Sequence, residues 1–305
     1  MYMKKVKFIL LMIVTSIMVS CGTTSIVPIT GRKHRLSVSD EQVLSLSAQE
    51  YTKYMQSAKA STNAANTAMV KRVGQKLANA VETYLNTHGF ANEVKYFNWE
   101  FNLVQDQSAN AFCMPGGKIV VYEGILPITQ DEASLAIVLG HEIAHAVAKH
   151  SAEQMSKATR SQTGLQIGSG ILSAIGVDQG IASAATSIAS QGLQLMNLKY
   201  SRDNESEADH MGLVFAAMAG YDPNVAISFW KRMSASGGSG TPAFLSSHPS
   251  DEKRIADIQK HLPEAMQYYK GGTTSTTTTK ATTKNTTTKK STAKAIKTTK
   301  TLHVK

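Results

Sequence analysis

Two histidines four residues apart, with a glutamate beside the first, lie in an otherwise apolar stretch at His141-Glu142-Ile143-Ala144-His145. On an α-helix this spacing puts both imidazoles on one face and the carboxylate next to them. Two imidazoles can hold a zinc ion, and the carboxylate can act as a base beside it. The motif therefore constrains the fold: it requires a helix here and a third ligand from elsewhere in the chain.

The predicted helix around the motif covers residues 129–156. Thr129 and Glu132 have the spacing of a capping box, and the apolar run at residues 133–139 continues into the motif without a helix breaker. The single Gly140 costs only about 1 kcal/mol relative to alanine, so it does not end the helix.

The remaining periodicity predicts a mostly helical α+β fold with a small β-sheet packed beside the motif helix. Apolar residues at helical spacing predict helices over residues 39–57, 63–88, 201–219 and 250–261, and another that begins at Asp222-Pro223. Alternation predicts a strand over residues 97–103, and a β-branched run predicts a second at Lys118–Tyr122, after the turn at Pro115-Gly116-Gly117.

Residues 164–198 are rich in Gly, Ala, Ile, Leu and Ser. Asp178-Gln179-Gly180 interrupts the segment, so neither half is long enough to cross a membrane. We expect a packed helical hairpin. The alternatives are a lid or plug over the site, which could inhibit it, or a surface that touches a membrane.

The N-terminus has the pattern of a signal peptide over residues 1–20. Three lysines precede a short apolar run that ends at Val19-Ser20-Cys21. A small residue before this cysteine resembles a bacterial lipobox, so Cys21 is expected to be lipidated; the alternative is an ordinary signal peptide. Because Gly22 rather than aspartate follows, the expected location is the outer membrane of a bacterial envelope, facing the periplasm.

The C-terminal segment, residues 271–305, is mostly threonine and lysine and is expected to be disordered. Its eight lysines and the three near the N-terminus supply eleven positive charges, against a net charge of +10, so residues 22–270 are within one charge of neutrality. The basic composition is therefore no argument for nucleic-acid binding. With Cys21 lipidated, Cys113 has no disulfide partner and is expected to be a small buried residue near a strand.

Several side chains downstream of the motif could supply the third ligand: His150, Glu205, Glu207, Asp209, His210 and His248. At about 100° per residue, His150 lies opposite His141 on a continuous helix and is expected to be solvated. Glu205 and Asp209 share a helix face. Glu207 is about 200° from Glu205, so both cannot meet one metal ion.

The motif and the later segment Ser201-Arg202-Asp203-Asn204-Glu205-Ser206-Glu207-Ala208-Asp209 together resemble the zinc metallopeptidase family that contains HtpX, the CAAX prenyl proteases and the periplasmic lipoproteins LoiP and BepA. Further blocks in the same order resemble that family: Asn110-Ala111-Phe112, Pro115-Gly116-Gly117, and Ser247-His248-Pro249 with Arg254. The chain lacks the transmembrane helices of the membrane-embedded members and the helical repeats of BepA, so it is most similar to the stand-alone lipoproteins.

The resemblance implies a metallopeptidase domain over residues 63–270, after an anchor and helical lead-in over residues 21–62. It implies one zinc ion per chain, with His141, His145 and Glu205 as ligands and Asp209 orienting His141. Glu142 is expected to activate a zinc-bound water. His248 and Arg254 are expected to stabilise the oxyanion, or His248 to take the fourth zinc position and inhibit the enzyme.

The expected activity is hydrolysis of peptide bonds in unfolded or misassembled envelope proteins. An extended substrate is expected to add as a strand along an edge at Lys118–Tyr122. The alternative is a non-catalytic, holdase-like assembly factor that works with the envelope assembly machinery. A purely structural zinc site is a third interpretation, which leaves Glu142 without a purpose.

Overall fold

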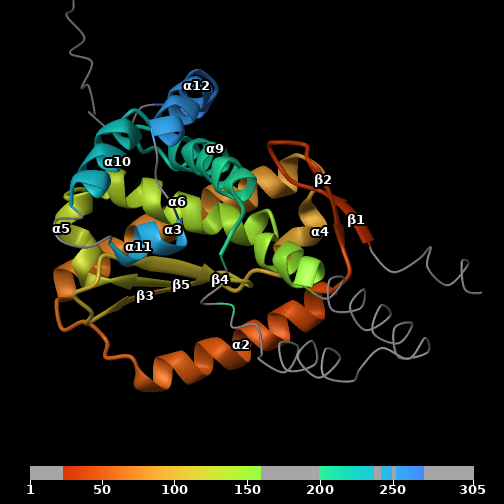
Figure 1. Ribbon diagram of the computed structural model, residues 1–305, viewed down its shortest axis with the longest axis horizontal. Helices are drawn as coiled ribbons and strands as arrows, with labels where there is room; N and C mark the ends of the chain where they lie inside the picture. The colour runs from red at the N-terminus through yellow and green to blue at the C-terminus, as the bar shows by residue number, and fades with distance from the viewer. Residues whose placement is uncertain (1–22, 159–194, 196–198, 237–241, 249–251, 271–305) are drawn as a thin grey trace, which may run out of the picture. The chain divides into compact units, whose positions relative to one another are not determined.

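Helix α6 (Glu132–Val147), which carries the HExxH motif, lies between a three-stranded sheet and helix α9 (Arg202–Met218), as Figure 1 shows. The computed structural model describes residues 23–158, 195, 199–236, 242–248 and 252–270. The predicted fold class, mostly helical α+β with a small sheet beside the motif helix, is confirmed.

Helix α6 begins after Asp131 rather than after Thr129, the predicted N-cap residue. Its N-cap is Asp131, whose side chain accepts a hydrogen bond from the backbone N–H of Ser134 at 2.7 Å. Thr129 instead ends the short helix α5 (Leu126–Thr129), where its hydroxyl donates to the carbonyl of Leu126. The capping-box prediction was wrong because Asp131, a stronger N-cap residue, is better placed at the helix start.

The sheet has the order β3-β5-β4, so β5 (Lys118–Tyr122) is its central strand. Strand β4 (Ala111–Met114) pairs with β5 in antiparallel register across the Pro-Gly-Gly turn, and β3 (Glu100–Val104) pairs with its other side in parallel. The prediction that Lys118–Tyr122 forms an edge was therefore wrong. Three consecutive buried residues at 119–121 are typical of a strand covered on both faces, which is the signal for a central position.

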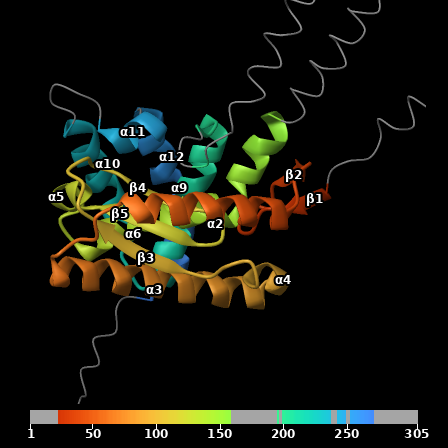
Figure 2. The same cartoon turned by 90° about the horizontal axis from the view of Figure 1, so that it is seen from below.

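Helices cover both faces of this sheet (Figures 1 and 2). Helix α3 (Ala64–Thr87) and α6 pack on one face, where Ile119 and Val121 of β5 join the main core. Helix α2 (Asp40–Ser57) covers the other face, where Tyr51 packs with Val120 in a smaller cluster. The alternation of β5 side chains between these two clusters follows from the two-residue repeat of a strand.

A glycine pair sets the distance between α6 and α9. A Cβ atom on Gly140 would come within 2.8 Å of the Gly212 carbonyl oxygen, and one on Gly212 within 2.8 Å of the His141 nitrogen. Backbone atoms cannot rotate away from such contacts, so the two helices approach this closely only because both residues lack a side chain. This close approach brings the motif helix against the residues that precede Gly212 on α9.

The other elements surround this centre. They are the antiparallel ribbon of β1 (Thr23–Ile26) and β2 (Lys33–Leu36), the short helices α4 (Ala91–Val94), η1 (Glu123–Ile125) and α11 (Ala243–Ser247), and the longer helices α10 (Val225–Ala235) and α12 (Glu252–Tyr268). Asp222-Pro223 does not start α10, because the Asp222 side chain instead closes a turn by accepting from the N–H of Asn224, the N-cap residue.

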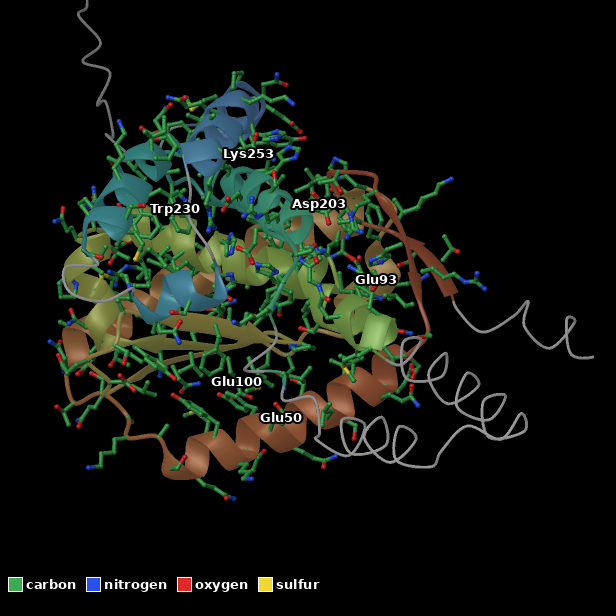
Figure 3. All side chains as sticks on the ribbon, viewed as in Figure 1. Glu50, Glu93, Glu100, Asp203, Trp230 and Lys253 are labelled. Atoms are coloured by element: carbon green, nitrogen blue, oxygen red, sulfur yellow. The ribbon has the colours of Figure 1, made fainter. Side chains whose placement is uncertain are left out.

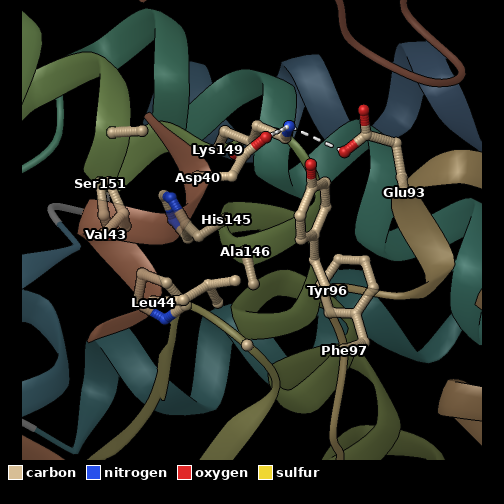
Figure 4. A pocket seen from close by; sticks show the side chains of 13 residues that line it. Asp40, Val43, Leu44, Glu93, Tyr96, Phe97, His145, Ala146, Lys149 and Ser151 are labelled. Carbon is tan, nitrogen blue, oxygen red and sulfur yellow. Dashed lines mark hydrogen bonds and ion pairs between the residues drawn. The ribbon is translucent and has the colours of Figure 1, made fainter. Parts of the chain in front are cut away.

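Helix α6 ends earlier than predicted. Lys149 has a left-handed backbone with φ of 55°, and the chain is helical again over residues 150–158. The Lys149 ammonium lies 2.8 Å from Asp40 of α2 and 2.7 Å from Glu93 of α4, as Figure 4 shows. These two ion pairs, made by residues distant in sequence, hold the break in place.

Several predictions fall outside the described residues: the signal peptide with Cys21, nearly all of the 164–198 segment, and the 271–305 tail. Leu195 is the single described residue of that middle segment and is buried. Among the described helices, none combines the length and apolar character that crossing a membrane requires.

Candidate metal centre

The two motif histidines lie in the interior, each 1 % exposed. Their positions four residues apart on α6 bring His141 Nε2 and His145 Nε2 within 3.1 Å. Burial lowers the pKa of His145 well below its ordinary value, with further lowering from His141. A neutral imidazole with a lone pair is the form that binds a metal ion.

Helix α9 brings Glu205 to these imidazoles. Its carboxylate oxygens lie 3.4 Å from His141 Nε2 and 3.5 Å from His145 Nε2. Ser201 starts the helix with a capping box, one turn before Glu205. Burial alone would raise the pKa of Glu205, but hydrogen bonds from His141 and His248 outweigh it and hold that pKa far below its ordinary value.

A fourth group, His248, enters from the turn after α11. Its Nδ1 lies 3.0 Å from a Glu205 oxygen and 3.2 Å from His141 Nε2, and Phe244 stacks on its ring. One ligand atom from each of His141, His145, Glu205 and His248 lies within 4.8 Å of the others. The structure thus places His248 among the predicted ligands.

The motif glutamate faces the same space. One oxygen of Glu142 accepts the backbone N–H of Cys113 on β4 at 3.1 Å. The other, Oε1, lies 3.4 Å from His248 Nε2 and has no hydrogen-bond partner among the described residues. Burial raises the pKa of Glu142. The raised basicity of Glu142 and the inward position of Oε1 both suit a carboxylate that accepts a proton.

Asp209, one turn after Glu205 on α9, contacts the far side of His141. Its Oδ1 lies 2.9 Å from His141 Nδ1, so it orients the ring through the nitrogen that faces away from Glu205. Burial would lower the pKa of His141, but Asp209 and Glu205 raise it to about 9. These carboxylates therefore favour positive charge at the imidazole, which a metal ion would supply.

Arg254 lies behind Asp209. Its Nη2 donates to Asp209 Oδ1 and its Nε lies beside Oδ2, both at 2.7 Å. Its guanidinium carbon is 3.5 Å from the ring centre of Trp230, a buried residue of α10 labelled in Figure 3. Its Nη1 donates to the His248 carbonyl oxygen at 3.2 Å and lies 3.7 Å from a Glu205 oxygen, so the guanidinium contacts groups of the site as well as Asp209 and Trp230. The predicted contact of Arg254 with the oxyanion stays a prediction.

The prediction that His150 is a solvated residue was wrong. His150 is fully buried, and its ring lies 2.8 Å from His145 Nδ1 and 2.9 Å from a Glu207 oxygen. The left-handed residue Lys149 interrupts the helix and turns His150 inward. The rotation of about 100° per residue therefore cannot be continued from His141 to His150. Glu207 in turn accepts a hydrogen bond from Arg32 at 2.8 Å. The N-terminal ribbon is thus linked through Glu207 and His150 to His145, a predicted ligand.

This buried network could not be inferred from local spacing. Glu207 does lie away from Glu205, as helical geometry predicts, but its partners come from the N-terminal ribbon and from beyond the end of α6. Only the unusual density of ionisable residues at 205–209 signalled that more than one carboxylate is used there.

Tyr200 is a further site residue that the sequence analysis missed. Its ring stacks on His145 with centroids 4.0 Å apart and an interplanar angle of 21°. Its hydroxyl hydrogen-bonds Ser151 at 3.0 Å, and burial raises its pKa. The one feature of the sequence that could have indicated Tyr200 is its position directly before Ser201, the N-cap residue of α9. This position places its ring next to the site.

The residues present fit a metal ion. Two imidazoles and a carboxylate, all buried, suit a borderline divalent metal, and His248 provides a further nitrogen. Glu142 Oε1 remains as a polar atom for a water molecule or a substrate to bind. Cys113 is a buried residue of strand β4, as predicted.

Comparison with known proteins agrees with this geometry. The sequence pattern of the family described as Peptidase family M48 matches residues 53–262. The mitochondrial metalloendopeptidase OMA1 of Schizosaccharomyces pombe is 41 % identical over 175 residues, 55 % of this chain and 48 % of that protein. The human mitochondrial metalloendopeptidase OMA1 is 32 % identical over 245 residues, 79 % of this chain and 46 % of that protein.

A bacterial protein also matches. The beta-barrel assembly-enhancing protease of Escherichia coli is 31 % identical over 185 residues, 58 % of this chain and 38 % of that protein. The chain spans about half the length, or less, of these relatives. The match confirms the metallopeptidase resemblance predicted from the motifs.

The predicted location is contradicted by the same comparison. The two OMA1 relatives reported above, which have the highest identities of those named, are mitochondrial proteins by name, so the expectation of a bacterial outer membrane was wrong. The prediction rested on the residues around Cys21, a short pattern outside both the matched region and the described residues. Lipidation of Cys21 stays a prediction.

Proposed function

The chain belongs to peptidase family M48, and from this we propose that it is a zinc-dependent endopeptidase that cleaves unfolded segments of proteins. The observation that carries the proposal is the inward Oε1 of Glu142, which accepts no hydrogen bond from the described residues and lies beside the buried set of His141, His145 and Glu205. A structural metal site has no use for such a carboxylate, whereas hydrolysis requires a base there.

His141, His145 and Glu205 would hold the zinc ion, with Asp209 fixing the ring of His141. Zinc bound there would lower the pKa of a water molecule and polarise the scissile carbonyl. Arg254 acts through Asp209: it neutralises that carboxylate and keeps it directed at His141. We therefore assign Arg254 a positioning role.

Glu142 acts as the general base and then as the general acid. Its Oε1 takes the proton of the attacking water, while its Oε2 is held by the N–H of Cys113. The same carboxyl then delivers this proton to the nitrogen of the leaving amine. The raised pKa of Glu142 brings its basicity closer to what transfer in both directions needs.

His248 has two states in this proposal. In the structure it sits among the ligand atoms, 3.0 Å from Glu205 and 3.4 Å from Glu142, which corresponds to a closed, resting site. When substrate enters, His248 leaves this position and donates to the developing oxyanion. Replacement by alanine would thus raise zinc exchange while lowering turnover.

The substrate would bind along β4 rather than β5. Strand β4 has β5 on one side and no other strand of the described sheet on the other. Its residues line a cavity together with Glu142, Tyr200 and His248. An extended segment that adds beside β4 would pass Glu142, and only an unfolded chain can present its backbone in this way.

The test is Glu142→Gln in the full chain, assayed on casein as an unfolded substrate. The amide keeps the shape but cannot accept the proton, so cleavage should fall by at least about 100-fold, the lower end of what a general base contributes. Zinc content should stay unchanged. Glu205→Ala should lose this zinc and the activity, whereas the matched Glu207→Ala, on the same helix, should keep the three ligands.

The holdase alternative makes the opposite prediction. If the wild type, purified with zinc, cleaves nothing, and both it and Glu142→Gln suppress aggregation of an unfolded client equally well, the chain is a binding protein built on a peptidase fold. Retention of cleavage by Glu142→Gln would refute the assigned base.

A further inference from the structure

A second group of metal-binding side chains lies between α9 and α12, away from the motif. We call it the α9–α12 cluster: His210 from α9, with His261 and Glu264 from α12. One ligand atom from each lies within 4.8 Å of the others. His210 Nε2 is 2.7 Å from a Glu264 oxygen, and the rings of His210 and His261 stack with centroids 3.9 Å apart.

Helical spacing explains how the cluster forms. His261 and Glu264 are three residues apart, so they share one face of α12. His210 directly follows Asp209, and a step of about 100° turns it away from the motif helix and toward α12. The packed pair of α9 and α12 then brings the three side chains together.

The surroundings of the cluster suit a cation. All three residues are partly buried: the side chain of His210 is 14 % exposed and that of Glu264 is 43 % exposed. Burial lowers the pKa of His261, and His210 and Lys260 lower it further, which favours the neutral imidazole that a metal ion binds. The charged groups that face it are Asp257, Lys260 and Glu264, with two acids against one base.

We propose that the α9–α12 cluster is a second metal site that binds one divalent transition ion, with Zn²⁺ as the natural candidate. Two imidazoles and a carboxylate select zinc, nickel or copper over Mg²⁺ and Ca²⁺, which prefer oxygen ligands. Three protein ligands leave positions for water, as expected for a site open to solvent.

Metal binding would require a local rearrangement. The rings of His210 and His261 are stacked, so the lone pairs of their nitrogens point in parallel directions rather than toward one point. One ring must rotate before both histidines can bind the same ion. The ion would replace the proton that His210 shares with Glu264. The side chain of Glu264 is more exposed than that of His210, so it has more room to follow the ring.

An ion in this cluster would tie α12 to α9. Helix α12 also carries Arg254, which holds Asp209 against His141. Zinc at the cluster would thus stabilise the packing that fixes the orientation of a motif ligand, because an ion that binds only the folded state raises stability. The inference concerns metal content and holds whether or not the chain is a peptidase.

The experiment is a zinc titration of the full chain, with metal measured by elemental analysis after gel filtration and cobalt spectra as a second readout. The wild type should bind two zinc ions per chain. His261→Ala and Glu205→Ala should each bind one, and the double variant none. Removing one ligand should weaken the cluster at least 10-fold, the lower limit for loss of an outer-shell partner.

His88→Ala is the matched control, because His88 is an exposed histidine at the C-cap of α3, outside both sites. It should keep two ions. Glu264→Gln, a surface change with the same shape, keeps the test valid if His261→Ala fails to fold, and it should also bind one ion. A wild type that saturates with one zinc, or a Glu264→Gln variant that keeps two, would overturn the proposal.

Discussion

Gly212→Ala probes the contact that builds the metal centre. In an ordinary helix interior this change stabilises the protein by about 1 kcal/mol, because alanine has the higher helix propensity. Here the new Cβ would lie 2.8 Å from the His141 nitrogen, 2.9 Å from the Gly140 carbonyl carbon and 3.0 Å from the His141 Cα. All three atoms are backbone atoms of α6, so none can move aside alone.

The two effects have opposite signs and can be compared. Relieving the closest contact to 3.4 Å, where ordinary contact begins, moves α9 from α6 by about 0.6 Å. Overpacking of this kind costs typically about 1–3 kcal/mol, and a contact with rigid backbone belongs near the upper end. After subtracting the gain in helix propensity, we expect a net loss of about 1–2 kcal/mol.

The same displacement separates the metal ligands. Glu205 and Asp209 precede Gly212 on α9 and move with it, whereas His141 stays on α6. Metal–ligand distances tolerate only about 0.2 Å, so a shift of about 0.6 Å should lower zinc affinity at the motif by at least 10-fold.

The assay is urea denaturation at pH 7 in the presence of a chelator, followed by zinc competition on the same samples. Ser206→Ala is the control, because it raises helix propensity on α9 at a position that is not fully buried. Gly140→Ala should resemble Gly212→Ala, and the double variant should lose less than the two losses added together, since both relieve one contact. A Gly212→Ala protein as stable as the wild type, with unchanged zinc affinity, would refute the reasoning.

Two further predictions concern buried partners of the ligands. Glu207→Gln should cost about 2–3 kcal/mol, because Arg32 and His150 lose a charged acceptor; urea denaturation at pH 7 measures it. Hydrogen bonds from His150 and Arg32 outweigh burial and lower the pKa of Glu207 to about 2, so its stabilisation is complete above about pH 4.5 and is lost as the pH falls toward 2. The variant should show a shallower loss over this range in the presence of a chelator, and an unchanged slope would contradict the assignment. Tyr200→Leu should weaken zinc binding because His145 loses its stacked ring, whereas Tyr200→Phe should bind zinc like the wild type; equal affinities in both variants would show that the ring has no positioning role.

Elements with strong local signals were predicted well. The strand Lys118–Tyr122 and the helix that ends before Gly220 agree with the structure, because a β-branched run, a serine cap and a glycine with positive φ act within a few residues. The predicted helix over residues 63–88 is observed at Ala64–Thr87. The errors came where partners distant in sequence decide the outcome.

His150 and β5 show why. Helical periodicity placed His150 outside, but Asp40 and Glu93 hold Lys149 in a left-handed turn that brings it in. The strand at 118–122 was expected at an edge, but β3 occupies that side in parallel pairing. The break at Lys149 has no signal within the segment itself, whereas the apolar run at residues 119–121 was a signal of a central strand.

The candidate metal-binding residues could be identified from the sequence alone. An HExxH helix and a later helix with Glu205 and Asp209 on one face define a donor set, because helical geometry fixes which side chains share a face. Tertiary structure decided which of the remaining polar groups take part. Close packing at Gly140 and Gly212 brings the two helices together. Other contacts between elements place His248 and Tyr200 on the ligands and bury His150 with Glu207. Such contacts depend on the relative placement of whole elements, which no local pattern encodes.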